Sequence, residues 1–357
     1  APAPVAVYSG QAGVEAPDPS FGGQGPPLAG CSSCGGCVIG CRIGAKNTLD
    51  QNYLHLAEAL GSVIQPDTRV DAVGPREGGG YAVRSRRQRW TADRVVFAGG
   101  VLGTVPLLLK MRQDPAGLPA LSPRLGDFVR SNSESLIGVS TRRPDLDLSA
   151  GVAIGSILHP DAHSSIEPVR YPSGSGVFRL LMAPHAPGKN AAVRLARAAG
   201  ELLRHPWRWT QAYWKRDWAR RTSILLYMRT LEGSLRLRRG RFGGLRSGLA
   251  DGPAPTAAIP EATELARAFA EEVDGVVSSL ITETALGIPS TAHILGGACM
   301  GASAADGVIG ADHQVHGYPG LYVVDGAAVS ANPGVNPALT ITALAERAMS
   351  AIPENSP

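Results

Sequence analysis

Long stretches of the chain repeat apolar residues every three or four positions, the spacing that places them on one face of an α-helix. On this basis we expect helices over residues 52–60, 101–111, 193–204 and 261–284. Gly61 is a common residue just past a helix end, and Pro206 stops the third helix. Pro260 suits the start of the fourth. The chain is therefore predicted to have a substantial helical part.

Other stretches are short, rich in β-branched residues and separated by Gly and Pro, which predicts strands. We expect strands over residues 62–64, 69–73, 81–84, 89–92, 94–98, 223–230 and 235–241. The runs at 81–84 and 89–92 are expected to form a hairpin, and 235–241 is a candidate partner of 223–230. From about residue 140 to 181, short alternating runs predict an antiparallel sheet in a second domain.

One strand is followed directly by glycines and a helix. The run 94–98 leads into Gly99 and Gly100, and Ala98-x-Gly100-x-x-Gly103 falls one residue short of the fingerprint that places a dinucleotide pyrophosphate at a helix N-terminus. The same pattern also suits a tight turn that packs a helix on a sheet. Both interpretations remain open at this point.

Length and composition set broad limits. With 357 residues, 44% hydrophobic and 18% charged, the chain has ordinary globular composition and can bury a large core. No apolar run approaches the roughly 20 residues of a membrane-spanning helix. We expect a protein of a reducing compartment, cytoplasmic or peripheral to a membrane. Residues 1–30 are rich in Pro, Gly and Ala and are expected to form an irregular connector.

Four of the five cysteines lie within eleven residues, at Cys31, Cys34, Cys37 and Cys41. Their spacing matches the bacterial ferredoxin pattern for an iron–sulfur cluster. That pattern usually has Pro after its fourth Cys, whereas Arg42 follows here. A structural or thiol role is therefore favoured over a bound metal cluster, which stays the alternative.

Positive charge is concentrated in residues 186–250, which hold 15 Lys and Arg against Glu201, Asp217 and Glu232. Four of the five tryptophans lie between residues 207 and 218, among these cations. Such a segment can rest on an anionic membrane surface, and it can equally be a partly buried cover on a domain. No recognition motif accompanies it, so nucleic acid is not an expected partner.

Two places carry side chains suited to catalysis. His293 lies in a glycine-rich run, and an imidazole can take a proton from an alcohol near neutral pH, although a lone His is more often structural. Asn336-Pro337 is a typical helix start and precedes an apolar stretch through Ile352, with Asn336 as the predicted N-cap. The positive end of that helix would stabilise negative charge, but an ordinary capped helix gives the same pattern.

Three ordered motifs make the interpretation more specific. They are His293-Ile-Leu-Gly-Gly, Leu321-Tyr-Val-Val-Asp-Gly, and Gly334-Val-Asn-Pro-Ala-Leu-Thr-Ile-Thr-Ala-Leu-Ala-Glu-Arg. Together they resemble the C-terminal signature of the glucose-methanol-choline (GMC) oxidoreductases. The segments 44–54 and 95–104 are also similar to the cholesterol oxidase branch of that family, so the resemblance covers most of residues 4–351.

The resemblance implies an FAD-dependent oxidase of alcohols, with a 3β-hydroxysteroid as favoured substrate and O₂ as a possible electron acceptor. By the same matching, His293 is the catalytic histidine, Asn336 is the second active-site residue, and both face the flavin. The matched cofactor residues are Val70 by the adenine, Gly99 and Gly100 near the dinucleotide, Asp325 and Gly326 by the ribityl and phosphate portion, and Pro337 and Thr340 by the flavin ring.

Sterol oxidases of this type also use a carboxylate of the substrate domain to move a double bond. Glu167 is the matching residue, and its alternative is an ion pair with Arg170 on a surface strand. The family's flavin-binding fold begins with a Gly-x-Gly-x-x-Gly unit that residues 1–30 do not contain. A second hypothesis is therefore a non-catalytic remnant, or one part of a split flavoenzyme that cannot bind FAD alone.

The expected architecture is a two-domain α/β (α+β) fold. Residues 1–135 are predicted to form a partial FAD-binding domain with the connector and the cysteine cluster, and 136–290 a substrate-binding domain with a mainly antiparallel sheet and covering helices. Residues 291–357 are predicted to return to the FAD-binding domain with the catalytic His and Asn.

Overall fold

The computed structural model describes residues 5–214, 217–231, 233–250, 255–256 and 258–353. The chain forms two compact units, each assembled from segments that are distant in sequence. Unit 1 comprises Ala1–Gln65, Glu134–Met228 and Thr256–Ser290, and unit 2 comprises Pro66–Ser133, Arg229–Pro255 and Thr291–Pro357. Both units combine helices with sheets, which confirms the predicted mixed α/β class.

The units differ from the predicted domains in one respect. Residues 1–65 group with the middle of the chain instead of with the segment 66–133. Local contacts explain this grouping. The Gly35 N–H donates to the Gly151 carbonyl at 2.8 Å, and the Ala153 N–H donates to the Cys37 Sγ at 3.5 Å. The predicted domain boundaries at 135/136 and 290/291 lie within two residues of the unit boundaries at 133/134 and 290/291. The function of each unit as a domain stays a prediction.

Unit 1 contains a six-stranded sheet among its described residues. Its order is β11 (Met182–Pro184), β15 (Gly275–Leu280), β8 (Ser135–Thr141), β12 (Thr222–Arg229), β10 (Ser164–Val169) and β9 (Leu158–Asp161). β8 pairs antiparallel with both β12 and β15, β11 pairs antiparallel with β15, and β10 with β9. The antiparallel sheet predicted for the second domain is thus confirmed.

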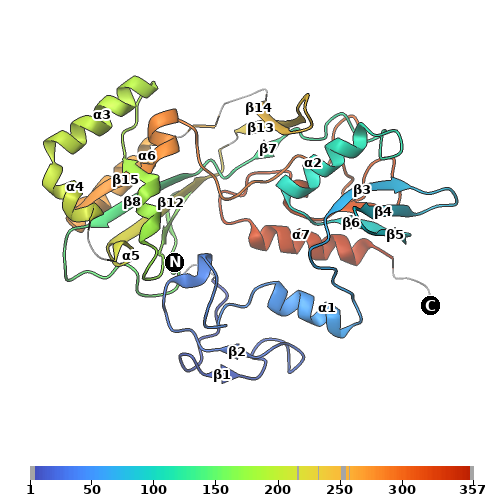
Figure 1. Ribbon diagram of the computed structural model, residues 1–357, viewed down its shortest axis with the longest axis horizontal. Coiled ribbons are helices and arrows are strands. Elements are labelled where there is room, and N and C mark those ends of the chain that lie inside the picture. Colours follow the sequence, from blue (N-terminus) through green and yellow to red (C-terminus); the bar gives the residue numbers. More distant parts are fainter. Residues whose placement is uncertain (1–4, 215–216, 232, 251–254, 257, 354–357) are drawn as a thin grey trace. The chain divides into compact units, whose positions relative to one another are not determined.

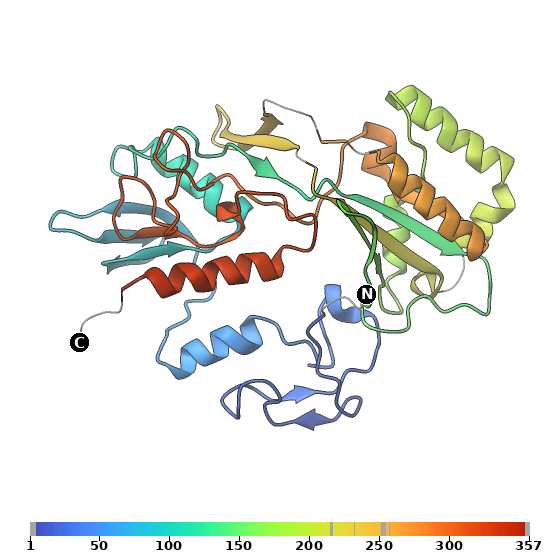
Figure 2. The same ribbon diagram turned by 180° about the vertical axis from the view of Figure 1, so that it is seen from behind.

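Helix α6 (Pro260–Glu272) packs against β8 and β15, as Figure 1 shows. Its buried Ala262 and Ala266 contact a core that includes Ile137 and Val139 of β8. The predicted helix 261–284 is wrong beyond Glu272. Asp274 has a left-handed φ of 47°, which breaks the helix, and the apolar residues that follow belong to strand β15. Figure 2 shows the same arrangement from behind.

Further helices of unit 1 lie in the basic segment. They are α3 (Ala191–Arg204), α4 (Pro206–Tyr213) and α5 (Trp218–Arg221). The Asn190 side chain caps α3 by accepting from the Val193 N–H at 2.9 Å, which gives the predicted helix a defined start. Lys215, Arg216 and Glu232 of the basic segment lie outside the described residues.

The N-terminal part of unit 1 has little regular structure. Its elements are β1 (Glu15–Ala16), β2 (Leu28–Ala29), the 3₁₀ turn η1 (Gly36–Val38), the π-helical turn η2 (Asp50–Leu54) and α1 (His55–Ala59). The predicted helix 52–60 is confirmed, with a π-helical first part. The predicted strand 62–64 is wrong, because Val63 is largely exposed and no strand pairs with it in the described chain. Unit 1 also has the 3₁₀ helix η3 (Gly176–Leu181) and the π-helical turn η4 (Thr282–Leu286).

The described residues of unit 2 form three small sheets. They are the parallel pair β16 (Leu321–Val323) with β6 (Val95–Phe97), the antiparallel sheet of β3 (Val70–Pro75), β4 (Tyr81–Ser85) and β5 (Arg89–Ala92), and the sheet of β14 (Leu245–Leu249), β13 (Ser234–Arg239) and β7 (Val129–Arg130). The predicted hairpin is β4–β5. The predicted pairing of 235–241 with 223–230 is wrong, because β13 pairs with β14 and β7.

The core of unit 2 lies under helix α2 (Val101–Arg112). Val101, Val105 and Leu108 are fully buried at helical spacing and pack with Phe97 of β6 and Leu321 of β16. The strand–glycine–helix unit expected from the sequence is therefore formed. The remaining elements are η5 (Gly326–Ala328) and α7 (Ala338–Ala351). None of the described helices has both the length and the apolar character that a bilayer-spanning segment requires.

Candidate active site

The turn after β6 is joined to the end of β16 through one carboxylate. Asp325 is buried, and its Oδ2 accepts from the Gly100 N–H at 2.8 Å and from the Thr104 hydroxyl, while its Oδ1 accepts from the Ala327 N–H at 2.8 Å. The Thr104 hydroxyl oxygen also accepts from the Gly99 N–H at 3.1 Å. The parallel strands bring these groups to the same end of the small sheet.

This arrangement limits where a phosphate can bind. The Gly100 N–H at the start of α2 is already bonded to a carboxylate, and a second anion at the same N–H would be repelled by Asp325. The near-fingerprint around Gly100 thus forms a tight turn that packs a helix on a sheet. The contact of Gly99 and Gly100 with a dinucleotide stays a prediction.

The segment that carries His293 meets both other motifs of the resemblance. The Gly296 N–H donates to the Gly326 carbonyl at 2.9 Å. A Cβ added to Gly326 would lie 3.5 Å from the Ile294 carbonyl oxygen and 3.5 Å from the Ile341 Cδ1 in α7. The chain next to His293, the Asp-Gly turn and the first turns of α7 therefore converge within unit 2.

His293 itself lies in an irregular, half-buried segment, and its N–H donates to the Thr291 hydroxyl at 3.0 Å. The two glycines that follow, Gly296 and Gly297, have positive φ values of 79° and 92°. A Cβ on Gly296 would lie 2.1 Å from the Phe128 carbonyl, and one on Gly297 would lie 2.9 Å from Val105. These glycines are required by packing against the protein's own chain.

Helix α7 begins one residue later than the sequence predicted. Its first helical residue is Ala338, Pro337 occupies the N-cap position, and no side chain caps the helix. Asn336 as the N-cap is therefore wrong. Thr340 lies in the first turn and is half-buried. The first turn of a helix has N–H groups without helical acceptors and carries partial positive charge.

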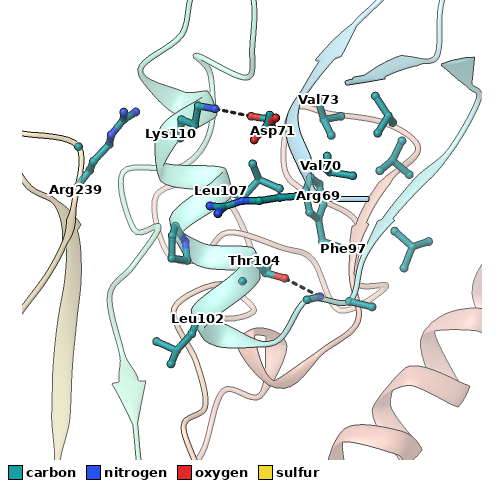
Figure 3. A pocket seen from close by; sticks show the side chains of 18 residues that line it. Arg69, Val70, Asp71, Val73, Phe97, Leu102, Thr104, Leu107, Lys110 and Arg239 are labelled. Carbon is teal, nitrogen blue, oxygen red and sulfur yellow. Dashed lines mark hydrogen bonds between the residues drawn. The ribbon is translucent and has the colours of Figure 1, made fainter. Parts of the chain in front are cut away.

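Unit 2 also contains a pocket of about 690 Å³ between β3, β6 and α2. Figure 3 shows Val70 and Phe97 on one side and Leu107 of α2 on the other. Arg69 and Lys110 supply positive charge, and Lys110 is held by its bond to the Asp71 carbonyl at 2.7 Å. The pocket is lined by two of the matched cofactor residues, Val70 and Gly99, and by none of the other seven matched positions in unit 2.

The third matched catalytic residue, Glu167, belongs to β10 of unit 1 and is 2% exposed. Its alternative placement on a surface strand is therefore wrong. The same unit has a small apolar pocket of about 60 Å³ and a neighbouring one of about 480 Å³, and Met182 lines both. The smaller pocket is walled by Leu136, Tyr171, Phe178, Leu181, Trp218, Ile224 and Leu280.

Some notable residues were not found from the sequence. Glu283 in η4 is 5% exposed, and burial raises its pKa to about 7. Ser290 opposes this shift and the charge of Glu134 adds to it, while neither Glu283 oxygen has a hydrogen-bond partner of good geometry. The sequence signal for Thr104 is its position four residues after Gly100, one helical turn into α2.

The four clustered cysteines do not come together in one group in the described chain. No group of three or more Cys, His, Asp or Glu among the described residues could hold a metal ion. Cys37 is buried, and Cys41 accepts from the Ala45 N–H at 3.3 Å. Burial raises the pKa of the Cys41 thiol, but hydrogen bonds from the backbone at Ala45, Lys46, Ile43 and Gly44 outweigh it and hold that pKa below its usual value.

Comparison with known proteins gives a consistent result. The chain is 44% identical to a cholesterol oxidase of Mycobacterium tuberculosis over 99% of its own length and 65% of that protein. It is 39% identical to a cholesterol oxidase of Acinetobacter baumannii over 96% of its own length and 65% of that protein. The chain thus spans slightly less than two thirds of either relative.

Solved structures share the fold at low sequence identity. Pyridoxine 4-oxidase from Mesorbium loti matches with a TM-score of 0.56 at 14% identity, covering 87% of this chain and 62% of that one. A formate oxidase variant of Aspergillus oryzae matches with a TM-score of 0.53 at 14% identity, covering 84% and 62%. The model of the family GMC_oxred_C, GMC oxidoreductase, matches residues 202–345. This chain therefore contains a GMC oxidoreductase C-terminal domain over residues 202–345, and over 99% of its length it is similar to a cholesterol oxidase.

Proposed function

We propose that this chain carries the substrate-oxidising site of an FAD-dependent oxidoreductase acting on the CH–OH group of an alcohol. The observation that supports this most directly is the convergence of the His293 segment, the Asp325-Gly326 turn and the start of α7 within unit 2. Bound FAD would supply the acceptor for the hydride that leaves the alcohol carbon. All other parts of the reaction fall to side chains of this chain.

In this proposal His293 accepts the proton of the substrate hydroxyl on its imidazole. Asn336, which lies just before α7, uses its side-chain amide to orient the hydroxyl oxygen. The first turn of α7, with Pro337 and Thr340, provides backbone N–H groups and partial positive charge near the ring that becomes negative. Each group then has a separate task in positioning or proton transfer.

The pocket beside α2 suits the adenosine half of FAD. Its walls are mainly apolar, Val70 and Gly99 line it, and a Cβ on Gly103 would meet no atom within 4 Å. Asp325 and Gly326 would lie by the ribityl and phosphate portion, with the phosphates away from the Gly100 N–H that Asp325 already occupies. The pocket residues therefore fit the cofactor.

We further propose a 3β-hydroxysteroid as the substrate. The two curated relatives named above are cholesterol oxidases, and the two pockets around Met182 are walled mainly by apolar side chains. Glu167, buried in β10, would move a proton so that the double bond shifts after oxidation. A Glu167→Gln variant should then release the unconjugated ketone. This role would be contradicted if the variant and the unsubstituted protein released conjugated and unconjugated ketone in the same ratio.

The role of His293 is tested by substitution. His293→Ala should lower the rate of flavin reduction by ~10²–10⁴-fold, as expected for loss of a general base, with flavin binding unchanged. His159→Ala, at an exposed histidine of unit 1, is the matched control and should react like the unsubstituted protein. A rate of flavin reduction in His293→Ala equal to the control would exclude the proposed proton transfer.

A second candidate function is one part of a split flavoenzyme. In the described part of the chain, no strand pairs with β6 on the side away from β16. The Val95 N–H and the Phe97 carbonyl bond to the β16 segment, while the alternating Val96 groups face away from it. Parallel sheets are normally covered, so this edge suits a further strand. FAD binding that appears only when the unmatched part of the M. tuberculosis relative is added would favour this candidate, and binding without it would exclude it.

Contact with a membrane surface is also proposed. Leu203, Trp207 and Trp214 of the α3–α4 region are 81%, 76% and 76% exposed among arginines. Such a mixture suits the interface of a bilayer that contains anionic lipid. Binding to anionic vesicles should weaken in a Trp207→Ala and Trp214→Ala double variant, and equal binding would refute the contact.

A further inference from the structure

Unit 1 contains a second, polar pocket that has no part in the proposed oxidation. It has a volume of about 560 Å³ and lies between α3, α4, α6 and β15. Its charged residues are Arg197, Glu201, Arg204, Arg208, Arg267 and Glu271. Four guanidinium groups thus surround one cavity together with only two carboxylates.

The carboxylates do not neutralise these arginines. Glu201 and Glu271 each lie four residues after an arginine on the same helix, a spacing at which ion pairs commonly form. Neither forms an ion pair with a pocket arginine, and the Glu201 carboxylate instead accepts from the Trp209 ring N–H at 3.4 Å. Apart from an ion pair of Arg208 with Asp274, the positive charge of the pocket is therefore not taken up by carboxylates of the described residues.

Two of the arginines are held in place by the protein. A guanidinium nitrogen of Arg197 donates to the Pro187 carbonyl, and Arg208 donates to the Gly275 carbonyl at 3.3 Å and lies 3.6 Å from an Asp274 oxygen. Arg204 and Arg267 come from two different helices, and neither has an ion pair or hydrogen bond with a described residue. Fixed and free guanidinium groups together can surround a ligand.

One of these arginines affects the pKa of a histidine in the pocket. His185 lines it, and burial and then the charge of Arg267 lower the pKa of its imidazole to about 4. Its Nε2 lies 2.9 Å from the Thr263 hydroxyl oxygen. His185 is therefore neutral at physiological pH and adds no further positive charge, so the positive charge of the site comes from the four arginines.

We propose that this pocket is a binding site for a phosphate-bearing anion, either a soluble phosphorylated molecule or the headgroup of an anionic phospholipid. Guanidinium groups match phosphate oxygens with paired hydrogen bonds, and several of them around one cavity favour a multiply charged phosphate group. The volume exceeds that of one phosphate group, so there is room for the organic part of the ligand.

Pyrophosphate titrated into the whole protein by calorimetry is the first test. We expect saturable binding that weakens as salt is added and that falls by at least ~10-fold in an Arg204→Gln and Arg267→Gln double variant, because each loses a charged hydrogen bond. Lys189→Gln, at an exposed cation just before α3 that does not line the pocket, is the matched control and should bind like the unsubstituted protein.

The two sources of phosphate are separated with vesicles of phosphatidylcholine containing phosphatidic acid. Vesicle binding that pyrophosphate displaces, and that the double variant loses, assigns the pocket to a lipid headgroup. Pyrophosphate binding without such displacement assigns it to a soluble phosphorylated molecule. The proposal is overturned if pyrophosphate does not saturate, or if the double variant binds it as tightly as Lys189→Gln. None of these readouts depends on flavin or on alcohol oxidation, so the proposed function is tested separately.

Discussion

Gly296 and Gly297 show how a residue can resemble part of a cofactor site for a different reason. Both follow the catalytic candidate His293, and the sequence suggested that the backbone there must come close to another group. The close neighbours are the Phe128 carbonyl and Val105 of the same unit. These glycines hold the His293 segment against the core, so they act on the site through its position.

Replacement of Gly296 by Ala should therefore destabilise the fold. A Cβ at this position would lie 2.1 Å from the Phe128 carbonyl oxygen, and the φ of Gly296 is 79°, which disfavours a side chain. Neither the clash nor the unfavourable φ can be relieved without moving the backbone. We expect a loss of at least about 2 kcal/mol in the free energy of unfolding, measured by denaturant titration. Gly103→Ala, inside α2 with no neighbour within 4 Å, should instead gain about 0.5–1 kcal/mol. Equal effects of the two changes would contradict this account.

Glu283 predicts a pH dependence of stability. Below pH 4.5 its carboxyl is neutral in both folded and unfolded chains. Between pH 4.5 and about 7 only the unfolded chain ionises, so folding stability falls as pH rises through this window, by up to about 3 kcal/mol, and stays lower above it. The loss arises because burial disfavours the charged form.

Glu283→Gln should remove that loss, and the free energy of unfolding of the variant relative to the unsubstituted protein should rise from pH 4.5 to pH 8. Glu264→Gln, at an exposed position of α6, serves as the control and should show a constant difference. A constant difference for Glu283→Gln as well would show that this carboxyl ionises normally in the folded chain.

At the scale of elements, Asp325 joins two parts of unit 2 that are 225 residues apart in sequence. Its carboxylate connects the end of β16 with the start of α2 through Gly100 and Thr104. Asp325→Ala should cost about 3 kcal/mol of stability without flavin present, because two N–H groups and one hydroxyl lose a charged acceptor. Thr104→Val should cost less.

The double variant gives the decisive comparison. If the two side chains act through their shared bond, the combined loss of Asp325→Ala and Thr104→Val should be smaller than the sum of the two single losses. Strict additivity in denaturant titrations would show that the carboxylate and the hydroxyl contribute independently.

The elements also show what the sequence could and could not predict. The helix over α2 and the β4–β5 hairpin were predicted because neighbouring residues along the chain carry their signals: a strand followed by glycines for α2, and two short strand-like runs for the hairpin. The predicted helix 261–284 failed at Asp274, since Val276 and Leu280 fit a helical face and a strand equally well. The choice between them was made by the neighbouring strands β8 and β11, which no local pattern contains.

At the scale of the whole molecule, the candidate residues divide between the two units. His293, Asn336 and all the matched cofactor residues lie in unit 2, whereas Glu167 lies in unit 1. The sequence motifs predicted these positions because each motif is continuous in the chain. Thr104 and Glu283 were missed, since the importance of each depends on neighbours that are distant in sequence or on burial.

The chain as a whole should bind FAD and reduce it with a 3β-hydroxysteroid. The most direct test is to titrate the purified chain with FAD, remove unbound flavin, and follow the flavin absorbance after adding the steroid without oxygen. The account predicts retained flavin that is bleached by the steroid in the unsubstituted chain and bleached far more slowly in His293→Ala. It is contradicted if no flavin is retained, with or without the unmatched part of the M. tuberculosis relative, or if both proteins are bleached at the same rate.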